Sequence, residues 1–354
     1  MRRPTALALG LALLLVPASP ALAHPGHGTP TNPPAAPTTP TYGNGWKPLA
    51  PIAGGPRQEH SVAALNGKVY VLGGIEPGAE GGVVTTDRVE VYDTRRDRWS
   101  EAAPLPVPMN HPNVAAVGGR IYVLGALSGG NSWQAMRDSY VYDPRADRWT
   151  RLAPMPAGTE RGSAAMGVRG TKIYLAGGMR TLTPGPGGLQ DTVDTVSSYD
   201  VVTGRWETLP SLPQARDHVG GAVVGNTFYV LGGRDRGQVN VRDTVYAFDF
   251  GTGRWTERAP MPTARGGIAA AAVGTKIYTF GGEGNPAEGS HSVFAENEVY
   301  DTARDSWQRL APMAVPRHGT AAVAVGGTIH IPGGGTVGGA GPVDVNDAYR
   351  PGRR

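Results

Sequence analysis

Six tryptophans recur at nearly even intervals along this chain, which indicates one structural unit repeated six times. They are Trp46, Trp99, Trp149, Trp206, Trp255 and Trp307. The intervals between them are 53, 50, 57, 49 and 52 residues. A period of about fifty residues is typical of the blades of a β-propeller rather than of a helical solenoid.

Two further marks keep a fixed place in each unit. A Gly-Gly pair follows two apolar runs, as at Gly73-Gly74, and an aromatic-Asp pair comes later, as at Tyr92-Asp93. In five copies the aromatic residue lies seven positions before the tryptophan. Short apolar runs between glycine-containing turns predict four strands in each copy, which we name a, b, c and d in chain order.

This order of residues resembles the Kelch repeat, in which an arginine, two apolar strands, Gly-Gly, Tyr-Asp and a tryptophan follow one another. The resemblance covers residues 46 to about 351. It implies an all-β fold, a six-bladed propeller whose blades are four-stranded antiparallel sheets. Departures are local: Ala126 replaces the second glycine of copy two, Met109 replaces its arginine, and Tyr349-Arg350 replaces Tyr-Asp in copy six.

The two ends of the repeat region predict how the ring closes. The first copy begins with a lone strand d at Trp46, and the last copy ends after a strand c at about residues 343 to 349. We expect the N-terminal strand d to join the C-terminal strands a to c in one blade. Such a joint removes the free sheet edges that an open ring would expose.

Residues 1 to 23 carry the marks of a secretory signal peptide. Arg2 and Arg3 precede an apolar run over residues 6 to 16, and the small-residue site Ala21-Leu22-Ala23 follows. The apolar run is too short to span a bilayer, so no transmembrane segment is expected. We predict a secreted protein, extracellular or periplasmic, that is cleaved near Ala23.

Residues 24 to 45 contain six prolines and little apolar surface. This composition predicts an extended linker and leaves residues 46 to 354 for the propeller. Cleavage would make His24 the first residue, and an alternative use of the linker is a copper site formed by His24 and His27. The rest of the chain does not resemble enzymes that use such an N-terminal histidine.

Composition excludes several classes of protein. The chain has no cysteine, which excludes disulfides and thiolate metal sites. Its formal net charge is +4, and its arginines stand singly rather than in a run, so nucleic acid is not an expected partner. We expect a monomer, because a closed ring leaves no free blade edge.

Loop lengths indicate which face carries function. In an antiparallel blade the b–c and d–a loops lie at the same end. From the first glycine to the aromatic of the aromatic-Asp pair there are 19, 17, 22, 16, 19 and 16 residues, whereas the other spacings hardly vary. Because variable loops on a rigid scaffold tend to carry function, we place the binding site on this face and expect the opposite face to be structural.

Five arginines stand sixteen residues before the first glycine of their copies, at the start of the innermost strand. In one interpretation they ring the channel mouth and clamp an anionic ligand through bidentate guanidinium contacts. In the other, favoured because this arginine belongs to the Kelch consensus, each ties its blade to the next through backbone carbonyls or a loop carboxylate. The five are Arg57, Arg161, Arg216, Arg265 and Arg317.

Polar residues beside these arginines differ between copies and break the symmetry of the ring. Candidate catalytic residues are Glu160, Asp217 and His218, because a histidine and a carboxylate near arginine can serve as an acid–base pair. The alternative is a solvated rim. Four histidines around the mouth are an alternative metal site, but no H-x-H or H-x-x-x-H spacing groups them, so no metal is expected there. The set comprises Glu59-His60, Asn110-His111, Glu160, Asp217-His218 and His318, in which His60, His111 and His318 are candidate binding residues.

Trp133 is the one tryptophan outside the repeat register, in the predicted b–c loop over residues 128 to 138. An exposed indole there suits stacking on a sugar or a protein contact. The alternative is that it folds back to cover the place of the missing glycine.

The resemblance allows two functions. The first is a binding module that presents the variable-loop face to a glycan, a cell-wall polymer or a protein. The alternative is a cofactor-free carbohydrate enzyme like the exported six-bladed Kelch proteins that interconvert the anomers of sialic acid, the mutarotases. Galactose oxidase also has Kelch repeats, but its copper site needs a cysteine crosslinked to tyrosine, which this chain lacks. We therefore expect no cofactor.

Overall fold

The computed structural model describes residues 43, 45–130, 132–183 and 190–352. The predicted signal peptide, His24, His27 and nearly all of the predicted linker lie outside the described residues. Within those ranges, no helix has the length and apolar character needed to cross a membrane.

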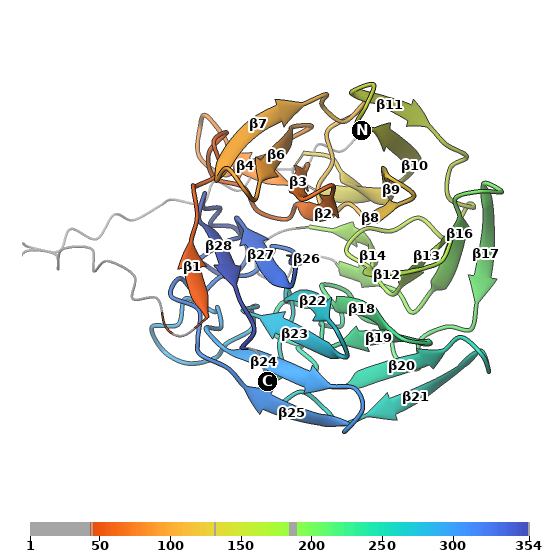
Figure 1. Cartoon of the computed structure of the whole chain (residues 1–354), viewed down its shortest axis with the longest axis vertical. Helices are drawn as coiled ribbons and strands as arrows, with labels where there is room; N and C mark the ends of the chain where they lie inside the picture. The colour runs from red at the N-terminus through yellow and green to blue at the C-terminus, as the bar shows by residue number, and fades with distance from the viewer. Residues whose placement is uncertain (1–42, 44, 131, 184–189, 353–354) are drawn as a thin grey trace, which may run out of the picture. The chain divides into compact units, whose positions relative to one another are not determined.

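The described residues form six antiparallel blades arranged around one axis, as the repeat predicts (Figure 1). Strand a is innermost and strand d outermost in each blade. From a to d, the blades are β2 (Ser61–Leu65), β3 (Lys68–Leu72), β6 (Val89–Asp93) and β7 (Arg98–Ala102); β8 (Val114–Val117), β9 (Arg120–Ser128), β10 (Trp133–Asp143) and β11 (Arg148–Arg151); β12 (Ala165–Arg169), β13 (Lys172–Ala176), β16 (Val196–Asp200) and β17 (Arg205–Leu209); β18 (Gly220–Val224), β19 (Thr227–Leu231), β20 (Val245–Asp249) and β21 (Arg254–Arg258); β22 (Ala269–Val273), β23 (Lys276–Phe280), β24 (Asn297–Asp301) and β25 (Ser306–Arg309); and β26 (Val323–Val325), β27 (Thr328–Pro332), β28 (Asn346–Tyr349) and β1 (Trp46–Pro48).

The ring closes through β1, which confirms the predicted joint. β1 pairs with β28 in the register Trp46 to Tyr349 and completes the sixth blade (Figure 1). The indole of Trp46 packs against Phe280 of the fifth blade at a ring separation of 5.6 Å and donates to the Ala311 carbonyl at 3.2 Å. The first strand therefore holds the last two blades together.

The second blade departs from the other five. Elsewhere both residues of the Gly-Gly pair adopt positive φ, as at Gly73 (60°) and Gly74 (100°), and strand b ends there. Copy two has Ala126 in the second position, without positive φ, so β9 runs on to Ser128 and pairs with a lengthened β10. The segment predicted as a loop is therefore largely strand.

Short strands also form within two of the b–c connections. β4 (Ile75–Pro77) pairs with β5 (Val83–Thr85) in the first blade. β14 (Met179–Leu182) and β15 (Gln190–Thr192) pair with each other, and β14 also pairs with β10 of the second blade. This last contact links two neighbouring blades on the b–c loop face.

The apolar core lies between the blades rather than within one. Tyr70 and Leu72 of the first blade pack with Ile121 and Tyr142 of the second in one buried cluster. Each blade buries both faces against its neighbours in this way, so the stability of the ring comes from the interfaces between copies.

Candidate functional site

The five repeat arginines are buried, not exposed at a channel mouth. Arg57 donates from Nη1 to the Gly73 carbonyl at 3.1 Å and from Nη2 to Glu90 at 3.0 Å. Glu90 lies on strand c of the same blade, so the guanidinium joins strands a, b and c of its own blade and not the next one. No surface is left on these side chains for an anion: Arg57, Arg161, Arg216, Arg265 and Arg317 are each 0% exposed.

The residue two positions after each arginine, or after Met109 in copy two, lies next to the ring axis with a positive φ. This axial ring comprises four residues with side chains and two glycines. A positive φ strains residues other than glycine and clusters at functional sites. The members and their φ angles are Glu59 (53°), His111 (49°), Ser163 (57°), His218 (49°), Gly267 (61°) and Gly319 (58°).

Hydrogen bonds run around the axis from one member of the axial ring to another. The amide of His111 donates to the Glu59 carbonyl at 2.7 Å, and that of Ser163 donates to the His111 carbonyl at 3.0 Å. At the next step the amide of His218 donates to the Ser163 hydroxyl at 3.2 Å. The two glycines continue the circle back to Glu59. These bonds fix the backbone from which the polar side chains project.

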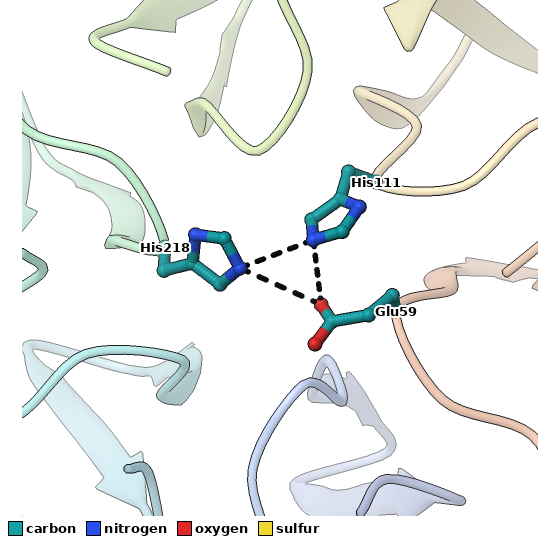
Figure 2. A group of neighbouring side chains, drawn as sticks. All are labelled: Glu59, His111 and His218. Atoms are coloured by element: carbon teal, nitrogen blue, oxygen red, sulfur yellow. Dashed lines mark hydrogen bonds and ion pairs between the residues drawn. The ribbon is translucent and has the colours of Figure 1, made fainter. Parts of the chain in front are cut away.

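Three side chains of the axial ring converge on one point (Figure 2). Glu59 Oε2 lies 3.0 Å from His111 Nε2 and 3.8 Å from His218 Nε2. The two Nε2 atoms are 3.1 Å apart. All three side chains are at least 93% buried, so their interactions are only weakly screened by water. We call Glu59, His111 and His218 the axial triad.

Each histidine of the axial triad is oriented by a hydrogen bond at its other ring nitrogen, Nδ1. His111 Nδ1 lies 2.7 Å from Asn110 Oδ1, and His218 Nδ1 lies 2.6 Å from Asp217 Oδ1. A carboxylate only accepts hydrogen bonds, so Nδ1 of His218 carries the hydrogen. In the neutral rings, both Nε2 lone pairs then face Glu59.

Two more charged residues complete the cluster around Asp217. Arg234 donates to Asp217 at 3.2 Å and forms an ion pair with Glu283. Its Nη2 also lies 3.1 Å from His218 Nε2. With the histidines neutral, the carboxylates of Glu59, Asp217 and Glu283 and the single guanidinium of Arg234 give a formal charge of −3 + 1 = −2. This charge is buried.

The cluster shifts the pKa values of its members. Burial alone would raise the pKa of Glu59, but the positive charge that His111, His218 and His318 carry when protonated outweighs burial and holds it well below its ordinary value. Burial and then repulsion from Arg234 lower the pKa of His218, although Asp217 opposes both effects. At neutral pH Glu59 is therefore ionised and His218 is neutral.

A cavity of about 450 Å³ runs along the axis from the triad. Small apolar residues of the innermost strands line it, including Ala64, Ala116 and Ala272 next to the a–b turns. On the other side, the b–c loops cover the cluster: Gln58 Nε2 donates to the Gly339 carbonyl at 2.7 Å, and Gln238 Nε2 donates to Glu283 at 3.0 Å. The cavity thus extends toward the face that the loop lengths marked as structural.

Of the three candidate catalytic residues, the structure brings two together and places the third elsewhere. Asp217 and His218 are brought together in the cluster, whereas Glu160 accepts a hydrogen bond from the Gly158 backbone in its own turn at 2.7 Å. Trp133 is 6% exposed and its ring lies 5.5 Å from that of His111. Its indole therefore packs against the ring of His111 and lies in an apolar cluster with Leu127, and it is not exposed for stacking on a ligand.

The other two predicted histidines are also buried. His60 Nε2 lies 2.9 Å from the Pro332 carbonyl, and burial, followed by repulsion from Arg57, lowers the pKa of His60 to about 3. His318 Nε2 lies 2.8 Å from the Val337 carbonyl and Nδ1 lies 3.5 Å from Glu283. His60 joins the first blade to Pro332 of the sixth, whereas His318 belongs to the edge of the cluster.

Sequence reasoning noted Glu59 only as a neighbour of His60 and did not single out Arg234 or Glu283. Both missed residues directly follow a Gly-Gly pair, at Gly233 and Gly282. A signal was present for Glu59: when the copies are aligned on their arginines, the second following position reads Glu, His, Ser, His, Gly, Gly. Four polar residues and two glycines at one repeat position indicate a shared backbone conformation whose side chains differ from copy to copy.

The chain is similar to several Kelch proteins in sequence. It is 44% identical over 298 residues to the Kelch-like protein terF of Aspergillus terreus, covering 84% of this chain and 65% of that protein. It is 30% identical to Kelch-like protein 40 of Xenopus tropicalis, covering 53% of this chain and 28% of that protein. The chain thus spans just under two thirds of the first relative and less than a third of the second.

A solved structure and two family profiles also match the chain. The structure of YjhT superposes with a TM-score of 0.66 at 19% identity, covering 84% of this chain and 95% of that one, which shows a shared fold. The Kelch motif profile matches residues 56–106 and 108–156, and a profile for the KLHDC2/KLHL20/DRC7 Kelch-repeats domain matches residues 183–350. Together with the six repeated blades, these matches show that the chain belongs to the Kelch-repeat family of β-propellers.

Proposed function

We propose that this propeller binds a small polar molecule, of about the size of a monosaccharide, in the axial cavity and catalyses proton transfer on it. The observation that carries the proposal is the convergence of Glu59, His111 and His218 on strained backbone at the buried end of the cavity. A binding platform would instead present shallow aromatic and arginine surface, and Trp133 and the five arginines are buried.

The cavity suits a ligand of this size. Its volume of about 450 Å³ lies within the ~300–1,000 Å³ typical of small-molecule sites. Its wall is apolar along the inner strands, and its polar groups gather at one end. A sugar ring would lie against the wall with one or two hydroxyl groups at the axial triad.

The axial triad has the parts that general acid–base catalysis needs. His111 is the base: its Nε2 faces the cavity end, Asn110 orients the ring, and Glu59 stabilises the imidazolium that forms when a proton arrives. Both nitrogens of His218 are engaged, by Asp217 and Arg234, so His218 lies beside the ligand and does not exchange a proton with it. In ring opening, His111 takes the proton of the anomeric hydroxyl, the bond from the anomeric carbon to the ring oxygen breaks, and the ring oxygen receives a proton. The reverse steps close the ring on either face of the carbonyl, which is a mutarotase reaction.

We place this activity outside the cytoplasm, in line with the signal-peptide pattern that ends at Ala23. The names of the sequence relatives state only that they are Kelch-like proteins. The choice of a sugar as the ligand is therefore based on the shape and chemistry of the cavity.

The test compares anomer exchange by the purified chain for neutral and carboxylated monosaccharides, measured by NMR magnetisation exchange. His111→Gly removes the base while keeping a backbone conformation that Gly267 and Gly319 adopt at equivalent positions. We expect a loss of at least 100-fold in exchange rate, because general base catalysis contributes about 10²–10⁴-fold. His291→Gly, at an exposed histidine with φ = 52° outside the axial ring, is the matched control and should stay within a few-fold of the native rate.

Thermal stabilisation by the same sugars provides a second readout. A ligand at about a hundred times its Kd stabilises a fold by roughly 2.7 kcal/mol. Exchange at the native rate in His111→Gly, or no stabilisation by any monosaccharide, would contradict the proposal.

A second candidate is a binding module on the b–c loop face for a glycan, a cell-wall polymer or a protein. The observation that favours it is exposed apolar surface: Val84, Val239 and Val337 lie in b–c connections and are 48%, 78% and 42% exposed. Replacing Val239 and Val337 by glutamate would abolish capture of such a partner and leave the axial cavity unchanged. Retention of capture would remove this candidate.

A further inference from the structure

We propose that the axial triad is a binding site for one first-row divalent transition metal ion, with Glu59 Oε2, His111 Nε2 and His218 Nε2 as its ligands. The inference uses the same residues as the proposed function, and the two states exclude each other at any one time. An ion on Nε2 of His111 occupies the lone pair that the base needs, so sugar exchange belongs to the metal-free chain. It rests on the positions of three acceptor atoms, on the residues that orient them and on the charge of the cluster.

The distances between the ligand atoms match a metal ion. The three separations are 3.0, 3.1 and 3.8 Å, so the circle through the atoms has a radius of about 2 Å. A point slightly above their plane therefore lies about 2.1 Å from all three, which is the bond length that zinc forms with histidine nitrogen and carboxylate oxygen. No side chain has to change rotamer to reach this geometry.

The orientation of the histidines favours an ion at that point. Their Nδ1 atoms lie against Asn110 and Asp217, so that Nε2 of both rings and Oε2 of Glu59 are the atoms directed at one another. Figure 2 shows these three side chains facing one another. A cation shared by the three atoms, either a proton or a metal ion, offsets their mutual repulsion. A histidine whose Nδ1–H is held by a carboxylate or a carbonyl is also the usual arrangement behind a metal.

The wider cluster supplies the charge for a divalent ion. With neutral histidines its formal charge is −2, which a divalent cation balances. Asp217, the support of His218, is itself held by Gln190 Nε2 at 2.6 Å and by the hydroxyl of Thr192. Gln58 Nε2 holds the other oxygen of Glu59 at 3.1 Å, so Oε2 remains for the ion.

One contact competes with the metal. Arg234 Nη2 lies 3.1 Å from His218 Nε2, and an ion has to displace this hydrogen bond. Arg234 keeps its ion pairs with Asp217 and Glu283 when it does so. We therefore expect Arg234→Met to raise the metal affinity, an effect that a nonspecific surface ion would not show.

Two histidines and one carboxylate on one side of an ion leave positions open on the other. Such sets hold Zn²⁺ in catalytic sites and Fe²⁺ in oxygenases, so the ligands select the class of ion rather than one element. The open positions face the axial cavity. The neighbouring ring members Gly267 and Gly319 have no side chain to fill them; a Cβ on Gly319 would approach Glu59 Oε1 to 2.4 Å.

The test is a titration of the chelator-treated full chain with Co²⁺ and Zn²⁺. The protein carries no histidine tag, and His24→Asn and His27→Asn remove other imidazoles. Co²⁺ reports its ligands through visible absorption, and elemental analysis gives the stoichiometry. We expect one ion per chain, and at least 100-fold weaker binding in His111→Gly and in His218→Gly. His291→Gly, which removes an exposed histidine at φ = 52° outside the axial ring, should keep native binding.

Asp217→Asn is the second variant, because it leaves all three ligands in place. Loss of such an outer partner weakens metal binding by about 10–100-fold. Circular dichroism checks the fold of each variant. Failure of the chain to bind either ion at 1 mM, about a thousandfold above micromolar affinity, or unchanged binding in His218→Gly, overturns the inference. Sugar exchange by a chain that fails to bind metal would leave the proposed function standing alone.

Discussion

Replacing Glu59 by glycine should leave the propeller about as stable as the native chain while abolishing the proposed activity. Glu59 adopts φ = 53°, and two equivalent positions of the axial ring are already glycine, at φ = 61° and 58°. The backbone of the ring therefore accepts glycine without rearrangement. The substitution removes one of three carboxylates and lowers the buried formal charge from −2 to −1.

The size of the effect follows from two contributions. Left-handed backbone costs a residue with a side chain about 1–2 kcal/mol, and the greater freedom of glycine in the unfolded chain costs about 0.5–1 kcal/mol. The backbone change alone thus gains roughly 0.5–1 kcal/mol. The attractions that lower the pKa of Glu59 stabilise the fold at pH 7.5 and are lost in the variant, so they oppose this gain. We expect the free energy of unfolding to stay within about 1 kcal/mol of the native value.

Urea unfolding at pH 7.5, followed by tryptophan fluorescence, measures this change. Ser163→Gly is the matched control: it makes the same backbone change at φ = 57° but loses the hydrogen bond from the His218 amide, so its net effect should be near zero. If Glu59→Gly were less stable than the native chain by 1 kcal/mol or more, Glu59 would be a structural residue. The reasoning that its strain is retained for function would then be refuted.

Three further predictions concern the scaffold. Arg161→Ala should destabilise the chain by about 3 kcal/mol or more in urea unfolding, because the buried guanidinium donates to three carbonyls and the Ser197 hydroxyl; an effect below 1 kcal/mol would contradict its structural role. Burial, and then repulsion from Lys47, lower the pKa of His330 to about 4. Between pH 6.5 and pH 4 only the unfolded chain binds this proton, so the free energy of unfolding falls as the pH falls. His330→Tyr restores the repeat residue and should reduce the slope of the unfolding free energy against pH in that window by up to about 1.4 kcal/mol per pH unit. An unchanged slope would show that His330 is not the group that titrates. Asp97→Ala should cost about 2 kcal/mol, since Asp97 accepts from the Tyr92 hydroxyl and the Ala50 amide, and Asp97→Gly should cost less because φ is 51°; equal losses in thermal unfolding would show that strain is absent.

Much of the scaffold could be predicted because its signals are local. The Trp spacing and the Gly-Gly pairs predict the blades, and the lone strand at Trp46 predicts the closure onto β28. The sequence does not decide whether Trp133 is exposed or buried, because this depends on whether strand b ends or continues at one substituted residue, Ala126. A repeat sequence predicts the backbone conformation of a single residue poorly, because individual copies can differ from the consensus without losing the blade.

The sequence by itself determined the repeat, the blade and the closed ring, because each blade is specified by residues within about fifty positions of one another. Only the tertiary structure decided that the arginines are internal ties and that the axial triad exists. His111 and His218 are 107 residues apart and Glu59 lies in a third blade. Closure of the ring places the same position of every blade at the axis, and side chains that no local pattern connects then meet there.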